Sequence, residues 1–209
     1  MKWWASSAMC SLGALALIAC TPVLQEIRHA TILVDESRGG QVIGVRECGR
    51  VVGVTAGHLA DEGRLTGPRA ERVDLALVTH PVPTTGLALS SRPHTLGEPV
   101  WIIHSPQGMN RVLSEGVVMQ EGVTQESTFP IQMFVWGGSS GGAVVDRQGE
   151  LLGILIGAQY FVSPLSPFPQ IVPIAWAIDA QTIQNFIRAH VPACAETRSA
   201  EAEDVPEAG

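Results

Sequence analysis

The sequence is poor in charge, in lysine and in aromatic side chains. Charged residues make up 16% of its 209 residues, aromatic residues make up 5%, and the only lysine is Lys2. The formal net charge is −7, so the chain lacks the positive face that nucleic-acid binding needs. Glycine is plentiful, with 22 residues, but it is not periodic, and no heptad pattern is sustained. These absences exclude collagen-like and coiled-coil structures.

Metal-binding patterns are also absent, since no Cys/His spacing resembles a zinc site. We therefore expect no metal and no cofactor. Hydrophobic residues account for 45% of the chain, which is too many for a chain that is disordered throughout. The length fits one domain, or two small fused halves, with enough residues to bury a real core.

Residues 1–20 read as a targeting segment in which one charge, at Lys2, precedes an apolar stretch. The apolar run Leu12–Cys20 is too short to cross a bilayer but suits a signal peptide. Its end, Leu17-Ile18-Ala19-Cys20, resembles the bacterial lipobox, in which the cysteine is lipidated before cleavage. We expect export to the bacterial periplasm or cell envelope, with Cys20 as a lipid anchor and the only contact with a membrane. An ordinary secretory signal peptide is the alternative.

Two of the four cysteines are left once the leader and the anchor are set aside. Cys10 lies in the leader and Cys20 in the lipobox, so Cys48 and Cys194 remain as a candidate disulfide pair in an oxidising compartment. Two free thiols are the alternative.

From Thr31 onwards the sequence reads as all-β. Short apolar or alternating runs are separated by turn residues at intervals typical of a sandwich or a barrel. A helix is predicted over 179–190, with Asp179 as its N-cap, and residues 161–169 read as a loop. The predicted strands are 31–34, 41–46, 51–55, 73–78, 99–104, 111–121, 132–135, 143–146, 151–156 and 171–178.

Three short motifs carry candidate catalytic chemistry. Gly137–Ala143 surrounds a serine pair with glycines, and such a loop can aim successive N–H groups at a developing oxyanion. His58 follows a predicted strand, where an imidazole can act as base for a serine hydroxyl. Asp74 opens another strand, where a carboxylate can fix the imidazole tautomer. Alone, each has a plainer interpretation, as a turn, a surface histidine or a charge at a strand end.

Together, the order His58, Asp74, Ser140 resembles that of the chymotrypsin-like, or trypsin-like, serine peptidases. Three local motifs resemble those of the family: Thr55-Ala56-Gly57-His58, Val73-Asp74-Leu75-Ala76-Leu77, and the G-x-S-G-G motif Gly138-Ser139-Ser140-Gly141-Gly142. Two further stretches resemble the bacterial periplasmic Deg-type branch. They are Val100–Gly108 followed by Arg111–Val118, and Ala175–Ile178 followed by a helix.

The resemblance implies two six-stranded antiparallel Greek-key β-barrels and a C-terminal helix. The signal peptide is assigned to 1–20, a linker and first strand to 21–39, and the peptidase domain to 40–190, followed by an acidic disordered tail at 191–209. Within that domain we expect a first barrel at about 31–104, a second at about 111–178 and a closing helix at 179–190. We expect no PDZ domain.

The function implied is that of a serine endopeptidase that cleaves proteins or peptides through an acyl-enzyme. Ser140 attacks, His58 is general base and then acid, Asp74 orients it, and the N–H groups of Gly138 and Ser140 form the oxyanion hole. A catalytically inactive binding or scaffold protein on the same fold is the alternative.

The specificity pocket is assigned by counting back from Ser140. Phe134 falls at its base, beside Val135, Trp136 and Gly137, and the resemblance places Ile174, Ala175 and Trp176 in the opposing wall. Neither stretch holds a carboxylate, so we expect cleavage after small or medium apolar residues rather than after arginine or lysine.

The sequence departs from the family at two points. Only 16 positions separate His58 from Asp74, and Ser139 stands where many relatives carry Asp or Asn. Asp35 and Asp61 are rival carboxylates outside any matching motif. His80, His94 and His104 have no partner motif and are expected to be structural or on the surface.

Overall fold

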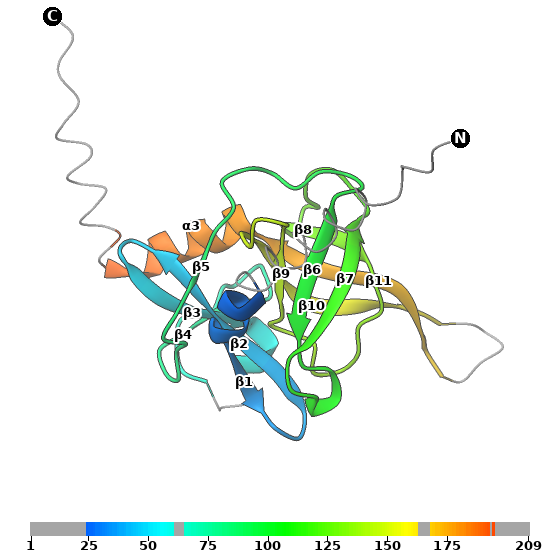
Figure 1. The fold of residues 1–209 in the computed structure, drawn as a ribbon, viewed down its shortest axis with the longest axis horizontal. Helices are drawn as coiled ribbons and strands as arrows, with labels where there is room; N and C mark the ends of the chain where they lie inside the picture. The colour runs from blue at the N-terminus through cyan, green and yellow to red at the C-terminus, as the bar shows by residue number, and fades with distance from the viewer. Residues whose placement is uncertain (1–23, 61–64, 163–167, 193, 195–209) are drawn as a thin grey trace, which may run out of the picture.

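The computed structural model describes residues 24–60, 65–162, 168–192 and 194. The targeting segment, Cys20, Asp61 and the tail from residue 195 lie outside these ranges. The all-β class is confirmed, because the described residues form eleven strands in two sheets and end in one longer helix (Figure 1). No helix among them is long and apolar enough to cross a membrane.

The first sheet has the order β1-β2-β3-β4, with β5 added to β2 in parallel. It contains five strands in the described part of the chain, where the sequence predicts a six-stranded barrel. β2 and β3 are joined by a two-residue turn in which Cys48 and Gly49 both have positive φ, as a tight hairpin requires. The strands are β1 (Thr31–Asp35), β2 (Gly39–Glu47), β3 (Arg50–Ala56), β4 (Leu75–Val78) and β5 (Leu87–Ala88).

The second sheet closes into a six-stranded antiparallel barrel in the order β10-β11-β8-β7-β6-β9. Its interior is filled by large buried side chains such as Phe129, Ile131 and Leu155. Figure 1 shows the β10–β11 hairpin projecting beyond the barrel. The strands are β6 (Pro99–His104), β7 (Val112–Val118), β8 (Thr128–Gln132), β9 (Ala143–Val145), β10 (Leu151–Phe161) and β11 (Gln170–Asp179), and a 3₁₀ turn η1 (Pro106–Gly108) follows β6.

Most predicted strands are confirmed within a few residues, but the strand expected at 132–135 is wrong. The chain forms β8 four residues earlier, and residues 133–135 have left the sheet. Pro130 conceals this strand in the sequence, because proline inside a strand usually argues against the assignment. The two-residue β5 and a short helical segment over 24–29 were not predicted either.

The helix α3 (Ala180–His190) joins the two halves and confirms the predicted closing helix. The Asp179 carboxylate accepts the backbone N–H of Thr182, as predicted for an N-cap. Its buried face, with Ile183 and Ile187, packs into one core with side chains of both sheets. A disulfide joins Cys48, in the β2–β3 turn, to Cys194, which confirms the candidate pair.

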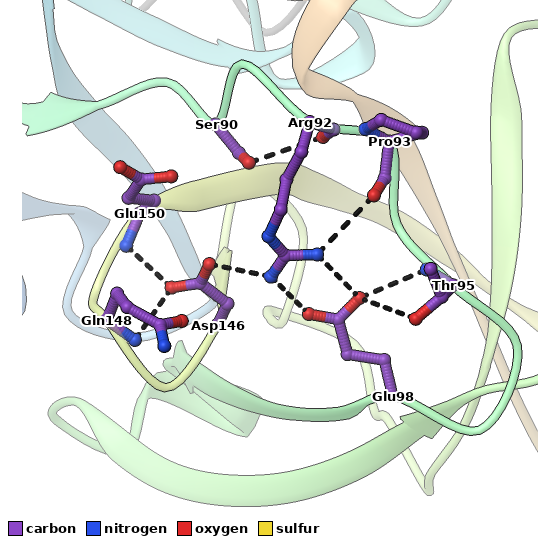
Figure 2. A network of polar contacts seen from close by, with 8 residues as sticks. All are labelled: Ser90, Arg92, Pro93, Thr95, Glu98, Asp146, Gln148 and Glu150. Carbon is purple, nitrogen blue, oxygen red and sulfur yellow. Dashed lines mark hydrogen bonds and ion pairs between the residues drawn. The ribbon is translucent and has the colours of Figure 1, made fainter.

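A partly buried ion-pair network fixes the segment between the two sheets (Figure 2). Arg92, in that segment, donates to Asp146 Oδ2 at 2.8 Å and to both carboxylate oxygens of Glu98. The Asp146 side chain, only 2% exposed, also accepts the backbone N–H groups of Gln148 and Glu150. These bonds connect the segment between β5 and β6 to the turn that follows β9.

Candidate active site

His58 and Asp74 meet because the strands that carry them are neighbours. His58 lies in α2 (Gly57–Ala60), directly after β3, and Asp74 directly precedes β4. β3 and β4 are antiparallel, with Ala56 opposite Leu75, so the end of one strand lies beside the start of the other. The spacing of 16 positions is therefore sufficient to pair them.

Two hydrogen bonds join these residues. His58 Nδ1 lies 2.6 Å from Asp74 Oδ2, and the backbone N–H of His58 donates to Asp74 Oδ1 at 2.7 Å. Burial alone would raise the pKa of Asp74, but the hydrogen bonds and the charge of His58 outweigh it and hold that pKa below its ordinary value. Asp74 is thus a carboxylate at neutral pH and can orient the imidazole ring.

Asp35, the rival carboxylate that the structure describes, does not occupy this position. Asp35 accepts the backbone N–H and the hydroxyl of Ser37, two residues along its own turn. Asp61 lies outside the described residues.

The loop that carries Ser140 runs against the start of β2. Gly40 N–H donates to Gly138 O at 2.7 Å, and Gln41 N–H donates to Ser140 O at 3.0 Å. Gly138 and Gly141 both have positive φ, and a Cβ atom on Gly141 would lie 2.0 Å from the carbonyl oxygen of Gln41. Glycine is required there by backbone conformation and by the close approach of β2.

Gln41 also links this loop to the strand that leads into His58. Its carbonyl oxygen accepts the hydroxyl of Thr55 at 2.6 Å, three residues before His58. A Cβ atom on Gly141 would lie 2.9 Å from that same hydroxyl oxygen. The structure thereby places the serine loop of the second sheet against the end of β3 in the first.

The backbone N–H groups of the loop fall into two sets. Those of Ser139, Gly141 and Gly142 donate to the carbonyl oxygens of Trp136, Leu155 and Ser139. Those of Gly138 and Ser140 have no acceptor among the described residues. Within the motif Gly138–Gly142, the two N–H groups that the resemblance assigns to an oxyanion hole are thus the two left without an acceptor.

A pocket of about 260 Å³ opens beside Ser140. Val135, Trp136 and Gly137 line it, as expected from the sequence, and none of the described residues that line it is charged. The other lining residues are Ser139, Ser140, Leu155, Ile156, Gly157, Ala158 and Tyr160.

The other residues assigned to the pocket lie elsewhere. Phe134 is 57% exposed and lines a separate groove with Trp101 and Val117. Ile174, Ala175 and Trp176 belong to β11, and none of them lines the pocket.

The wall comes instead from β10, because β10 borders the serine loop. Gly141 N–H donates to Leu155 O at 2.7 Å, and Leu155 N–H donates to Gly142 O at 2.9 Å. One signal in the sequence could have identified this wall. A strand, a turn and a second strand follow the serine loop, so the second strand must return to it.

The three histidines without a partner motif have different surroundings. His80 is exposed, and His94 is buried, with its ring stacked on Phe129 at a centroid distance of 4.1 Å. His104 is buried against the serine loop. No group of three or more side chains that could hold a metal ion occurs in the described ranges.

A closed antiparallel barrel, a second sheet and a C-terminal helix, with the histidine and serine motifs at the junction, define the chymotrypsin-like class of folds. Residues 28–154 match the model of the trypsin-like peptidase domain family. The chain belongs to that family.

Solved structures of a mycobacterial protease share this fold. The protease Rv3671c from M. tuberculosis, in an inactive serine-to-alanine mutant, superposes with a TM-score of 0.60 at 17% identity, covering 84% of this chain and 95% of the other. Its active form gives a TM-score of 0.60 at 16% identity, covering 84% and 86%. No curated protein sequence matches this chain.

Proposed function

We propose that this protein is a serine endopeptidase with Ser140 as nucleophile, His58 as general base and Asp74 as the residue that orients the base. The observation that carries the proposal is the double hydrogen bond between His58 and Asp74, next to a G-x-S-G-G loop packed against β2 and the end of β3. Membership of a peptidase family supports it.

The mechanism follows from which atoms are already engaged. His58 Nδ1 is held by Asp74, so Nε2 is the nitrogen that takes the proton from the Ser140 hydroxyl. As Ser140 Oγ bonds to the scissile carbonyl carbon, the oxyanion accepts the N–H groups of Gly138 and Ser140. The imidazolium then gives its proton to the leaving amine, and the acyl-enzyme remains.

Water completes the cycle by the same route. His58 removes a proton from the water molecule that attacks the acyl carbon, and it returns that proton to Ser140 Oγ as the ester bond breaks. Asp74 stabilises the imidazolium in both half-reactions and stays a carboxylate.

The substrate side chain that precedes the scissile bond enters the pocket beside Ser140. No charged residue lines this pocket in the part of the chain that the structure describes, and a buried charge without a partner costs several kcal/mol. The residue accepted there is therefore small or medium and apolar, such as alanine, valine or leucine.

The same proposal places the protein outside the cytoplasm. Residues 1–20 direct export, and Cys20 carries a lipid anchor in the cell envelope. The Cys48–Cys194 disulfide supports an oxidising compartment, because such bonds are rare where thiols are kept reduced.

A fluorophosphonate probe tests the proposed function. The full chain should be labelled at one serine, and Ser140→Ala should abolish the labelling, whereas Ser37→Ala, on an exposed turn, should not. A wild-type protein that takes up no probe and cleaves no peptide would instead be an inactive binding protein on this fold.

A further inference from the structure

A buried histidine that the proposed mechanism does not use lies beneath the serine loop. His104 is the last residue of β6 and is 2% exposed. Its Nδ1 lies 2.8 Å from the Ser139 hydroxyl, and its Nε2 lies 2.8 Å from the hydroxyl of Ser114 on β7. The ring therefore bridges the barrel wall and the residue immediately before the proposed nucleophile.

Ser139 holds the loop together through all of its polar atoms. Its backbone N–H donates to Trp136 O, and its carbonyl oxygen accepts the N–H of Gly142. Its hydroxyl oxygen also accepts the backbone N–H of Trp136 at 3.3 Å. Ser139 lies between Gly138 and Ser140, so its position sets the direction of the two N–H groups assigned to the oxyanion hole.

The hydrogen-bond network assigns one tautomer to His104. Burial lowers the pKa of His104 to about 4, so the ring is neutral at physiological pH, with one donor and one acceptor nitrogen. The Ser139 hydroxyl proton has no other acceptor among the described residues, so it is donated to Nδ1. Nε2–H is then donated to Ser114 Oγ, whose own hydrogen can reach solvent because Ser114 is only partly buried.

We propose that His104 is a positioning residue of this active site: it accepts the Ser139 hydroxyl and so fixes the loop that carries Ser140 and the two oxyanion N–H groups. This inference rests on the proposed function. His104 touches no reacting atom, so its removal should misplace the transition-state contacts rather than remove a reacting group.

Two substitutions at one position separate the two hydrogen bonds. In His104→Asn the amide falls where Nδ1 lies and keeps the bond to Ser139. In His104→Gln it reaches the position of Nε2 and keeps only the bond to Ser114. We expect kcat on an apolar peptide to fall about 10- to 100-fold in His104→Gln, with KM within about threefold, and to stay within about threefold of wild type in His104→Asn.

The matched control is His94→Gln. His94 is also buried, 5% exposed, and its ring makes one hydrogen bond, between Nε2 and Gly122 O, but it lies against Phe129 rather than the serine loop. This variant should unfold at a lower urea concentration with an unchanged kcat. If His104→Gln behaves in the same way, or if Asn and Gln at position 104 lower kcat equally, His104 only packs and the inference is overturned.

A second variant and a second measurement keep the test decisive. Ser139→Ala removes only the hydroxyl, so it should lower kcat as His104→Gln does, and the double variant should lose no more than the worse single variant. Hydrogen exchange of the amides of residues 136–142 should quicken in His104→Gln and not in His104→Asn. An unreactive wild-type protein would refute the proposed function, whereas a reactive one with unchanged kcat and exchange in His104→Gln would refute the positioning role alone.

Discussion

At the scale of residues, the proposed site depends on groups that make two contacts at once. Asp74 accepts both the ring and the backbone N–H of His58, so it sets the orientation of the ring and the tautomer together. The Ser139 hydroxyl likewise makes two contacts, because it accepts the backbone N–H of Trp136 in the loop and bonds to the His104 ring on the barrel.

The roles of the three proposed catalytic residues can be tested by substitution. Ser140→Ala and His58→Ala should each lower peptide hydrolysis by several orders of magnitude, since the hydroxyl is a poor nucleophile without its base. Asp74→Asn should be impaired by about 10⁴-fold, because the amide favours the wrong tautomer of His58. Steady-state kinetics measures these losses. Full activity in Asp74→Asn together with lost activity in Asp61→Asn would show that the acid is misassigned.

Gly141 should tolerate no side chain. In Gly141→Ala the new methyl group would meet the Gln41 carbonyl oxygen, and alanine would be strained at a φ of +77°. We expect a loss of about 1–3 kcal/mol in the free energy of unfolding and much slower probe labelling. Gly97→Ala, outside the serine loop, is the control, because its φ is +79° but its Cβ would meet nothing within 4 Å. Urea unfolding and labelling rates decide the matter, and equal effects in both variants would contradict this account.

The residue motifs were readable from the sequence because each is a local pattern. His58, Asp74 and the glycines around Ser140 stand in short stretches with a direct chemical meaning. His104 was expected to be structural or on the surface. Nothing beside it in the sequence shows that β6 ends under the serine loop, and that contact spans 35 positions to Ser139.

At the scale of elements, the sequence predicts strands better than it predicts which strands are neighbours. Apolar runs predict the second-barrel strands except β8, but the resemblance assigns the pocket wall to Ile174–Trp176. The order β10-β11-β8 puts β11 one strand further from the serine loop than β10. Neighbour order is a property of the closed barrel, and no local run encodes it.

The pocket built by β10 makes a prediction about specificity. Peptides with alanine, valine or leucine before the scissile bond should be cleaved with a higher kcat/KM than peptides with arginine or lysine there. The reason is that a basic side chain would lose its water against an uncharged wall. A panel of peptides that differ at this one residue measures the preference, and a preference for arginine or lysine would refute the assigned pocket.

At the scale of the whole molecule, the segment between the two sheets is held by contacts that the sequence does not reveal. An ion-pair network connects the segment between β5 and β6 to the second barrel (Figure 2). It consists of Arg92, Glu98 and Asp146, and none of these residues stands in a motif. The disulfide pair, in contrast, could be reached by simple elimination of the other cysteines.

The network predicts how stability depends on pH. The hydrogen bond from Arg92 holds the pKa of Glu98 below its ordinary value, so this pair stabilises the fold above about pH 4.3. That stability is lost as the pH falls through the lowered pKa, because the folded state must then take up the proton. Glu98→Gln should therefore be less stable at pH 7 and lose less on acidification. Urea unfolding at several pH values measures this, with exposed Glu126→Gln as the control; identical pH curves for wild type and Glu98→Gln would contradict it.

The lipobox predicts where the protein is found in the cell. Cys20→Ser should move the protein from the membrane pellet to the soluble or secreted fraction, because the acyl chains supply the membrane affinity. Cell fractionation followed by immunoblotting measures this distribution. An unchanged distribution would favour an ordinary signal peptide.

The disulfide between the β2–β3 turn and Cys194 also orders events during synthesis. A ribosome adds Cys194 after Cys48, 146 residues later. By then every strand of the barrel has been made, and α3 must dock on the first sheet before the two sulfur atoms can meet. Truncated or half-assembled chains therefore keep the Cys48 thiol, and a thiol-reactive reagent would distinguish them from chains whose two halves have come together.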